Sequence, residues 1–462
     1  MQFRRGVLAG AVGSLCLIGS SSVGWAQSLT EALSLAYNNH PQLNAARAST
    51  RAADEGLGIA AGAGRPKING TGTWGPSSTE IYTRPGLTPS SKVNYDLVPA
   101  TIGITLVQPI YAGGQIEAGK AQAEAAVRAQ REALRSAEQT VLLGAATAFM
   151  DVIRDTALVG LQESNVKFLA EQVRAAKDRF GVGEGTQTDV AQATASYQLA
   201  ISQLNASRAQ LNASRAEFRQ SVGKDPGKLT GAEAVDKLLP KSMEAAAQAA
   251  QSENPSVLAG IHNVDVASQN VKQLEGALLP QLGLQAGATR GWDSTNYKQM
   301  NNAQVGLQLT VPLYQGGGEH AKVRQAKEQL GAAKIQVDLA RDTVRYNVVA
   351  AWGMLQAANA SITAYKAQVE ASQLALNGVI EEQRVGQRTT LDVLNQQTSL
   401  ITAQSNLVNA ERSRIVGSFQ LVAAVGRLDA QHLRLKVAAY DPGAHYEAVK
   451  DKWIGLRTPD GR

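Results

Sequence analysis

Hydrophobic residues alternate with polar ones in four short stretches of the chain, as at Ile102, Ile104 and Leu106. A period of two is typical of half-buried strands, because neighbouring side chains of a strand point to opposite faces. The pattern predicts four strands, at about residues 67–74, 100–108, 281–290 and 303–311. Each is roughly as long as a strand that spans a membrane within a barrel.

Elsewhere the apolar residues follow a helical period. Residues 115–181 contain no proline and would be ~100 Å long as one helix, at ~1.5 Å per residue. A seven-residue apolar seam runs through the later part of this stretch, at Val152, Val159, Val166, Val173 and Phe180. Such seams are typical of coiled coils. We therefore expect long helices at 115–181, 188–222, 318–384 and 390–428, paired as antiparallel hairpins.

The chain repeats one plan twice. Pro66 and Pro280 lie 214 residues apart in matching contexts, whereas Tyr111 and Tyr314 lie 203 apart. The offset changes where one copy has a longer loop rich in proline, serine and threonine, Gly75–Pro99. An internal duplication with one unequal loop explains both spacings. It divides the chain into a first repeat at 27–222 and a second at 251–428, with separate segments at 223–250 and 429–462.

Between strand and helix, each copy carries a similar motif, with the sequence QPIYAGG in the first copy and VPLYQGG in the second. Proline cannot donate to a sheet, so it should stop the strand or lie at its edge. A glycine pair lets the backbone turn into the helix. A generic turn is the alternative, but the matched position favours a hinge at a membrane boundary, where tyrosine is common. The hinge residues are Pro109, Tyr111, Gly113, Gly114, Pro312, Tyr314, Gly316 and Gly317.

Four strands are too few to close a membrane barrel, since the smallest common ones have about eight. Several copies of the chain must therefore pool their strands. The periodicity alone does not choose between two copies and three.

The composition supports this plan. Only 5% of the residues are aromatic, which favours long packed helices over a large globular core. Residues 1–26 resemble a signal peptide, with Arg4 and Arg5 before an apolar stretch and cleavage expected after Ala26. Its removal lowers the net charge from +6 to +4, which is too weak and dispersed to favour nucleic acid. Cys16 lies in this leader behind the bulky Leu15, a poor context for lipid attachment, so we expect a mature chain without thiols.

No catalytic, cofactor or metal site is expected. The five histidines are scattered without the spacing of metal ligands. Residues 114–121 come close to a phosphate-binding loop but lack the final hydroxyl residue that would reach magnesium.

Taken in order, the motifs resemble those of the TolC family of outer-membrane efflux and secretion ducts. They are LTEAL at 29–33 with Asn39-His40-Pro41, the two hinge motifs, and the two helical turns with Val-Gly followed by Asp-Val. The resemblance implies a non-enzymatic homotrimer: a twelve-strand β-barrel in outer-membrane lipid, and a mainly α tunnel (an α-barrel) in the periplasm. The segments 223–250 and 429–462 would form an equatorial belt. The duct would work with a periplasmic adaptor (a membrane fusion protein) and an inner-membrane transporter.

The resemblance also implies roles at the periplasmic end. Asp392 falls on the first aperture-ring position and Asn395 on the second, where the family has another aspartate. Arg388 matches the arginine of the aperture lock, Asp189 its carboxylate partner, and Gln383 the place of a lock tyrosine. Helix capping is the alternative role for both aspartates, and a solvated turn for Arg388.

The hairpin tips are where the family meets its adaptor, so the resemblance makes Val182, Gly183, Val385 and Gly386 docking candidates. Their glycines also suit a plain tight reversal.

A soluble periplasmic coiled-coil scaffold or adaptor is the alternative function, although two alternating strand pairs favour the duct. Type I protein secretion and multidrug efflux both fit the sequence, as do open and closed resting states. The transported substrate is expected to depend on the inner-membrane partner.

Overall fold

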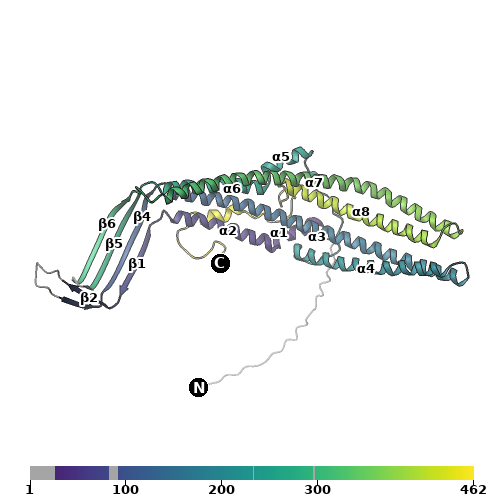
Figure 1. The fold of residues 1–462 in the computed structure, drawn as a ribbon, viewed down its shortest axis with the longest axis horizontal. Helices are drawn as coiled ribbons and strands as arrows, with labels where there is room; N and C mark the ends of the chain where they lie inside the picture. The colour runs from purple at the N-terminus through teal and green to yellow at the C-terminus, as the bar shows by residue number, and fades with distance from the viewer. Residues whose placement is uncertain (1–26, 83–91, 233, 295–296, 462) are drawn as a thin grey trace, which may run out of the picture.

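The computed structural model describes residues 27–82, 92–232, 234–294 and 297–461. The expected leader, its cleavage after Ala26 and Cys16 lie outside the described residues. Figure 1 shows an elongated molecule with a sheet at one end and long helical hairpins reaching to the other.

The two repeats are built from the same elements in the same order. The first contains α1 (Leu29–Asn39), α2 (Pro41–Gly62), β1 (Lys67–Trp74), β4 (Ala100–Ala112), α3 (Gln115–Gly181) and α4 (Gln187–Val222). The second contains α5 (Met243–Glu253), α6 (Pro255–Gly276), β5 (Gln281–Ser294), β6 (Tyr297–Thr310), α7 (Gly318–Arg384) and α8 (Thr390–Val425). The matched helices obey the two sequence offsets, 214 before the unequal loop and 203 after it.

Four strands form one antiparallel sheet in the order β1-β4-β5-β6. The two hairpins share one register, because Lys67 lies opposite Val107 in the first and Gln281 opposite Thr310 in the second. These pairs are related by the same offsets of 214 and 203. The β4–β5 pair joins the two repeats, and β1 and β6 are the edges.

Several strands are longer than the sequence pattern predicts. β4 continues through Pro109 to Ala112, with a register shift between Pro109 and Tyr111, so the strand does not stop at Pro109. Pro109 lies beyond Val107, the last residue of β4 that pairs with β1, which fits the other expected position, at an edge. A proline is tolerated at such an irregularity, where its missing N–H is not needed by the ladder. In the second copy, β6 ends at Thr310, before Pro312. Beyond residue 290, β5 continues to Ser294, and β6 begins at Tyr297, because pairing with each other extends both.

Other boundaries also differ from the expected ones. The helix expected at 390–428 ends at Val425, because Gly426 takes φ 101° and turns the chain. The expected border between 250 and 251 falls inside α5, which is the counterpart of α1 and therefore belongs to the second repeat. The first copy's longer loop contains an unexpected hairpin, β2 (Ser77–Tyr82) with β3 (Lys92–Leu97). A 3₁₀ turn at Asp236–Leu238 and α9 (Pro442–Val449) complete the elements.

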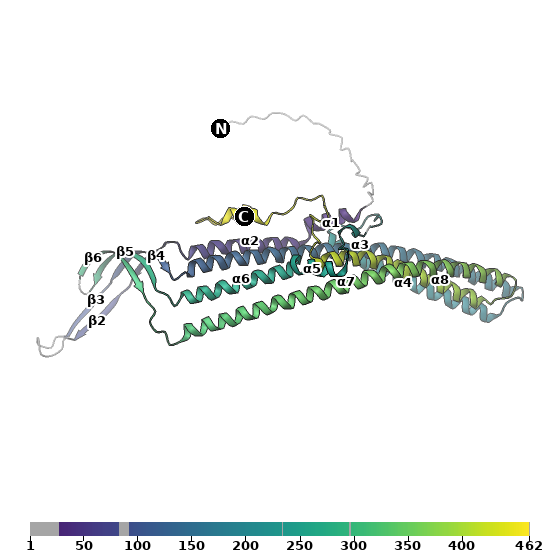
Figure 2. The same ribbon diagram turned by 90° about the horizontal axis from the view of Figure 1, so that it is seen from above.

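Four helices extend side by side from one end of the sheet, in the order α2, α3, α6 and α7 (Figure 2). Further along, α3 pairs with α4 and α7 with α8 as the two hairpins. The coiled-coil seam of the first copy is buried at Val152 and becomes exposed at Phe180, close to the tip. In the second copy, 203 residues later, the positions matching Val152 and Val173 are Leu355 and Leu376, and both are buried.

The largest core lies midway along the molecule, where α1, α3, α4 and α8 meet the segment after α8. Phe149, Phe218 and Phe419 are almost completely buried there, and the ring centroids of Phe149 and Phe218 lie 6.3 Å apart. Burial of each such side chain contributes about 2 kcal/mol. The core therefore fixes both hairpins at their base, and it does not extend to their tips.

Candidate functional site

The strand-to-helix boundary requires glycine in both copies. Gly113 and Gly114 have φ values of 63° and 80°, and Gly316 and Gly317 have 64° and 80°. This left-handed region disfavours residues with a side chain. Gly113 also lies against the end of α6, since a Cβ on it would be 2.2 Å from the carbonyl oxygen of Gly276.

The two boundaries differ in what covers them. Around Gly316 a Cβ would meet nothing within 4 Å. Tyr314 is 87% exposed, whereas its counterpart Tyr111 is 50% exposed. The reason is the neighbouring strand: β5 pairs with β4 up to Ala112, but β6 is an edge strand in the single chain.

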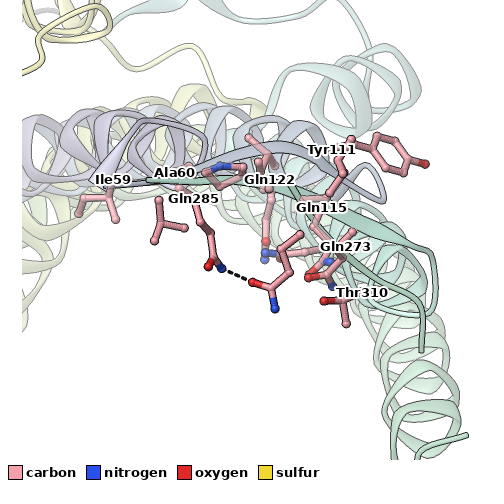
Figure 3. A pocket seen from close by; sticks show the side chains of 18 of the residues that line it. Ile59, Ala60, Tyr111, Gln115, Gln122, Gln273, Gln285 and Thr310 are labelled. Carbon is pink, nitrogen blue, oxygen red and sulfur yellow. Dashed lines mark hydrogen bonds between the residues drawn. The ribbon is translucent and has the colours of Figure 1, made fainter. Parts of the chain in front are cut away.

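A pocket of about 540 Å³, lined by both apolar side chains and amides, lies beside the first boundary (Figure 3). Its lining includes Ile59 and Ala60 of α2 and a cluster of amides: Gln115, Gln122, Gln273, Gln281, Gln285 and Gln308. Gln285 donates a hydrogen bond to Gln308, across β5 and β6. The labelled ring of Tyr111 extends away from these amides. Uncharged amides can bind water or polar solutes without selecting one sign of charge.

The four-stranded sheet has one apolar face and one polar face. The register places Ile68, Leu106, Ala286 and Val305 opposite one another in one apolar row. On this face, the following residues are all more than half exposed: Ile68, Ile102, Ile104, Val305, Leu307 and Leu309. An apolar surface of this breadth calls for an apolar partner. The neighbouring row, from Asn69 to Gln304, is polar or glycine.

Each hairpin tip has a capping box at the start of its returning helix. At the first tip, Asp189 N donates to Thr186 Oγ1 at 3.2 Å, and Thr186 N donates to Asp189 Oδ2 at 3.1 Å. The second tip repeats this with Thr389 and Asp392, at 3.2 and 3.0 Å. Hydrogen bonds from the threonine hold the pKa of both carboxyls below the ordinary value. Both carboxylates are thus ionised and fixed in place.

The expected lock residues form contacts within their own hairpin. Arg388 Nε donates to Glu382 Oε2 at 2.8 Å, and this bond raises the pKa of Arg388. In the described part of the chain, no hydrogen bond or ion pair joins Arg388 to Asp189. Gln383 is buried and donates to Thr390 Oγ1 at 3.2 Å. Asn395 is exposed one turn after Asp392, on the same side of α8.

At the tips themselves, apolar side chains face solvent. Val182 is 73% exposed and Val385 is 70% exposed. Each precedes a glycine, Gly183 or Gly386, with a φ of 80°. The glycines make the reversals possible, and the valines are available for contact with another protein.

Polar links between the two hairpins were not identified from the sequence. Gln397 Nε2 donates to Asn165 Oδ1 at 2.9 Å, and both side chains are buried. Closer to the core, Arg412 forms two hydrogen bonds with Asp151, at 2.9 and 3.2 Å. One signal was available, because Gln397 lies at core spacing between Val393 and Leu400 of the seam.

The helices among the described residues contain no apolar stretch of the length and hydropathy that a membrane span needs. In the same part of the chain, no cluster of three or more histidine, cysteine, aspartate or glutamate side chains could hold a metal ion.

Comparison with known proteins shows likeness along nearly the whole chain. Residues 32–224 and 246–427 match the family model described as Outer membrane efflux protein. The chain is 46% identical over 438 residues to the outer membrane efflux protein BepC of Brucella suis, covering 94% of this chain and 93% of that protein. It is 27% identical over 436 residues to the outer membrane protein TolC of Escherichia coli, covering 91% and 86%. The Campylobacter jejuni CmeC outer membrane channel has the same fold, with a TM-score of 0.75, 16% identity, and coverage of 92% and 89%.

Proposed function

Because this chain belongs to the outer membrane efflux protein family, we propose that three copies of it close around one axis to form a continuous export duct. The protein is an outer-membrane efflux or secretion channel with its helical tunnel in the periplasm. The observation that carries the trimer proposal is the sheet, which has two unpaired edges and an exposed apolar face. Unpaired strand edges are not tolerated in lipid, so β1 and β6 must find partners in other copies.

The duplication predicts how these edges pair. Within the chain, Leu106 of β4 lies opposite Ala286 of β5. Applying the offsets of 203 and 214 to this pair places Leu309 of β6 opposite Gly72 of β1 in the next copy. This register also keeps the apolar faces aligned, because Gly72 pairs with Ile102 and both Ile102 and Leu309 belong to the exposed apolar face. A slip by one residue would turn one apolar face inward.

The same reasoning applies to the boundary glycines. Gly113 lies against Gly276, and their counterparts are Gly316 and Gly62, around which a Cβ meets nothing within 4 Å in the single chain. We expect Gly316 to lie against Gly62 of the next copy. Residues 311–315 are unpaired here, whereas their counterparts belong to β4. They should become strand when the next β1 lies beside them.

Cysteine crosslinking tests this interface. The only cysteine of the sequence is Cys16, in the expected leader, so the mature chain should offer a clean background. Leu309→Cys with Gly72→Cys, and Gln308→Cys with Thr73→Cys, should form disulfide-linked dimers and trimers. Directly opposite pairs lie ~4.5–5.5 Å apart between Cα atoms, within disulfide reach. The pair Leu309→Cys with Trp74→Cys is diagonal, ~7–8 Å apart, and should not link. Linkage of this diagonal pair alone would exclude the predicted register.

In such a trimer, the polar face of the sheet and the amide pocket would line the aqueous interior. At the far end, one Asp392 per copy would place three fixed carboxylates around the mouth, a ring that favours cations. We propose that Arg388 leaves Glu382 for Asp189 of a neighbouring hairpin when the mouth is locked. Gln383, buried against Thr390, would only stiffen its hairpin. Single-channel conductance in planar bilayers tests the lock.

The tips are proposed to meet a periplasmic adaptor through Val182, Gly183, Val385 and Gly386, and the assembly to receive substrates from an inner-membrane transporter. The exposed valines support this, because an isolated apolar tip gains by burial in a partner. Crosslinking from Val182→Cys and Val385→Cys in whole cells should capture the adaptor. A soluble scaffold would have no use for the exposed apolar sheet.

A further inference from the structure

The last part of the chain returns along α2 towards the strand-to-helix boundary (Figure 1). α9 packs against α2, where His445 Nδ1 lies 3.2 Å from Asp54 Oδ2 and Val449 is buried. The guanidinium of Arg131 lies 5.2 Å from the ring centroid of Tyr446. The tail is therefore fixed against α2 and α3 and is not a loose end.

Beyond α9, one arginine positions the following residues at the level of the sheet. Arg65 Nη1 donates to the carbonyl oxygen of Lys452 at 3.0 Å, and its guanidinium lies 4.6 Å from the ring centroid of Trp453. Arg65 itself lies just before Lys67, the first residue of β1. Trp453 is thus held where the helices end and the strands begin.

Three large apolar side chains are presented at this level. Trp453 is 66% exposed, Ile454 90% and Leu456 103%. Lys452 Nζ donates to the carbonyl oxygen of Arg457, which closes this segment into a turn. The turn puts apolar side chains next to two basic residues, Lys452 and Arg457, and Arg65 ties its beginning to the residues just before β1.

This combination matches the chemistry of a membrane interface. Tryptophan and neighbouring apolar residues partition into the headgroup region, and lysine and arginine extend towards lipid phosphates. Water alone would leave the apolar area of Ile454 and Leu456 uncompensated. The link through Arg65 to the start of β1, whose sheet has an exposed apolar face, and the flanking positive charges both favour phospholipid over a protein partner.

We propose that residues 452–457 form an interfacial anchor, which inserts Trp453, Ile454 and Leu456 into the periplasmic-side surface of the outer membrane. Lys452 and Arg457 face the lipid phosphates. Arg65 couples the anchor to the start of β1, so the depth of the tail and the depth of the sheet are set together. This inference rests on the outer-membrane placement of the sheet.

Site-directed spin labelling of the full mature chain in phosphatidylethanolamine and phosphatidylglycerol vesicles tests the anchor. A label on Ile454→Cys should show a ratio of oxygen to nickel-chelate accessibility several-fold above that of Glu447→Cys. Glu447 is the matched control, because it belongs to the same tail but lies on α9, and its side chain is 63% exposed. Leu307→Cys, on the apolar sheet face, reports the placement of the sheet itself.

Three results would overturn the anchor. An Ile454 label as accessible to the nickel chelate as the Glu447 label would place the turn in water. An immobilised Ile454 label that neither reagent reaches would show that a protein surface, such as a second copy, covers the turn. A second label, on Leu456→Cys, covers the case in which Ile454→Cys fails to fold. If its ratio of oxygen to nickel-chelate accessibility is the same with and without vesicles, insertion is contradicted. In each case a high oxygen ratio at Leu307 shows that the channel's membrane placement still holds, whereas a low ratio there would reject that placement.

Discussion

Gln397 of α8 and Asn165 of α3 form a buried hydrogen bond of 2.9 Å that joins the two helical hairpins. Gln397→Leu leaves the Asn165 amide without this partner, and an unsatisfied buried polar group costs roughly 1–3 kcal/mol. We expect a lower unfolding midpoint in denaturant for Gln397→Leu. The double variant with Asn165→Leu should recover much of the loss, because both polar groups are then gone. An additive double variant would contradict a direct bond.

Gly276 and Gly62, the equivalent glycines at the ends of α6 and α2, should respond differently to substitution by alanine. In Gly276→Ala, the new Cβ would lie 2.5 Å from the carbonyl oxygen of Gly113, so the subunit itself should be destabilised by roughly 1–3 kcal/mol. Gly62→Ala meets no atom within 4 Å in one chain and should leave the subunit stable. It should nevertheless lower the fraction of detergent-resistant trimer on gels. Equal trimer yield for Gly62→Ala and the unaltered chain would speak against the proposed contact.

Replacing the exposed Asn395 with aspartate adds one carboxylate per copy, one turn from Asp392. We expect Asn395→Asp to raise cation selectivity, read as a larger reversal potential in a salt gradient across a planar bilayer. Asp392→Asn should lower it. Selectivity that ignores both substitutions would remove these positions from the mouth.

The ion pair between Arg388 and Glu382 competes with the proposed lock. Glu382→Gln weakens the competitor, so it should stabilise the lock and lower the closed-state conductance. Arg388→Ser should raise that conductance, because it removes the lock cation. Glu381→Gln is a matched control, since Glu381 pairs with Arg384 on the exposed side of the same turn. Changes of the same sign in Glu382→Gln and Arg388→Ser would contradict competition.

Acid should loosen the tips before the core. The pKa of Asp392 is lowered by hydrogen bonds from Thr389, so the folded tip holds fewer protons than the unfolded one. The stabilisation is complete above the ordinary value of 3.8 and is lost as pH falls through the lowered pKa. Amide exchange at residues 390–393, corrected for its intrinsic rate, should therefore rise in this range. Thr389→Ala should flatten the dependence, because it removes the bonds that shift the pKa.

Periodicity predicted the long helices closely, because proline-free seams and capping residues are local signals: α3 spans Gln115–Gly181 and α7 spans Gly318–Arg384, as expected. It failed at Pro109, because a partner strand that is distant in the sequence keeps β4 extended beyond the proline. The capping boxes could be read from Thr186 and Thr389. The pairing of Arg388 with Glu382 could not, because several charged residues lie within reach of any exposed turn.

Within the residues that the structure describes, a hairpin like β2–β3 is seen in the first repeat alone, at the end of the sheet farthest from the helices (Figure 1). The helices and the four-stranded sheets of a three-copy duct would repeat nearly every sixty degrees around its axis, since the two repeats of each chain are alike. The end formed by the β2–β3 hairpins would not, because these hairpins would alternate with the shorter β5–β6 connections. A molecule that binds the channel from outside the cell would therefore find three identical binding positions, one at each β2–β3 hairpin, and neither two nor six.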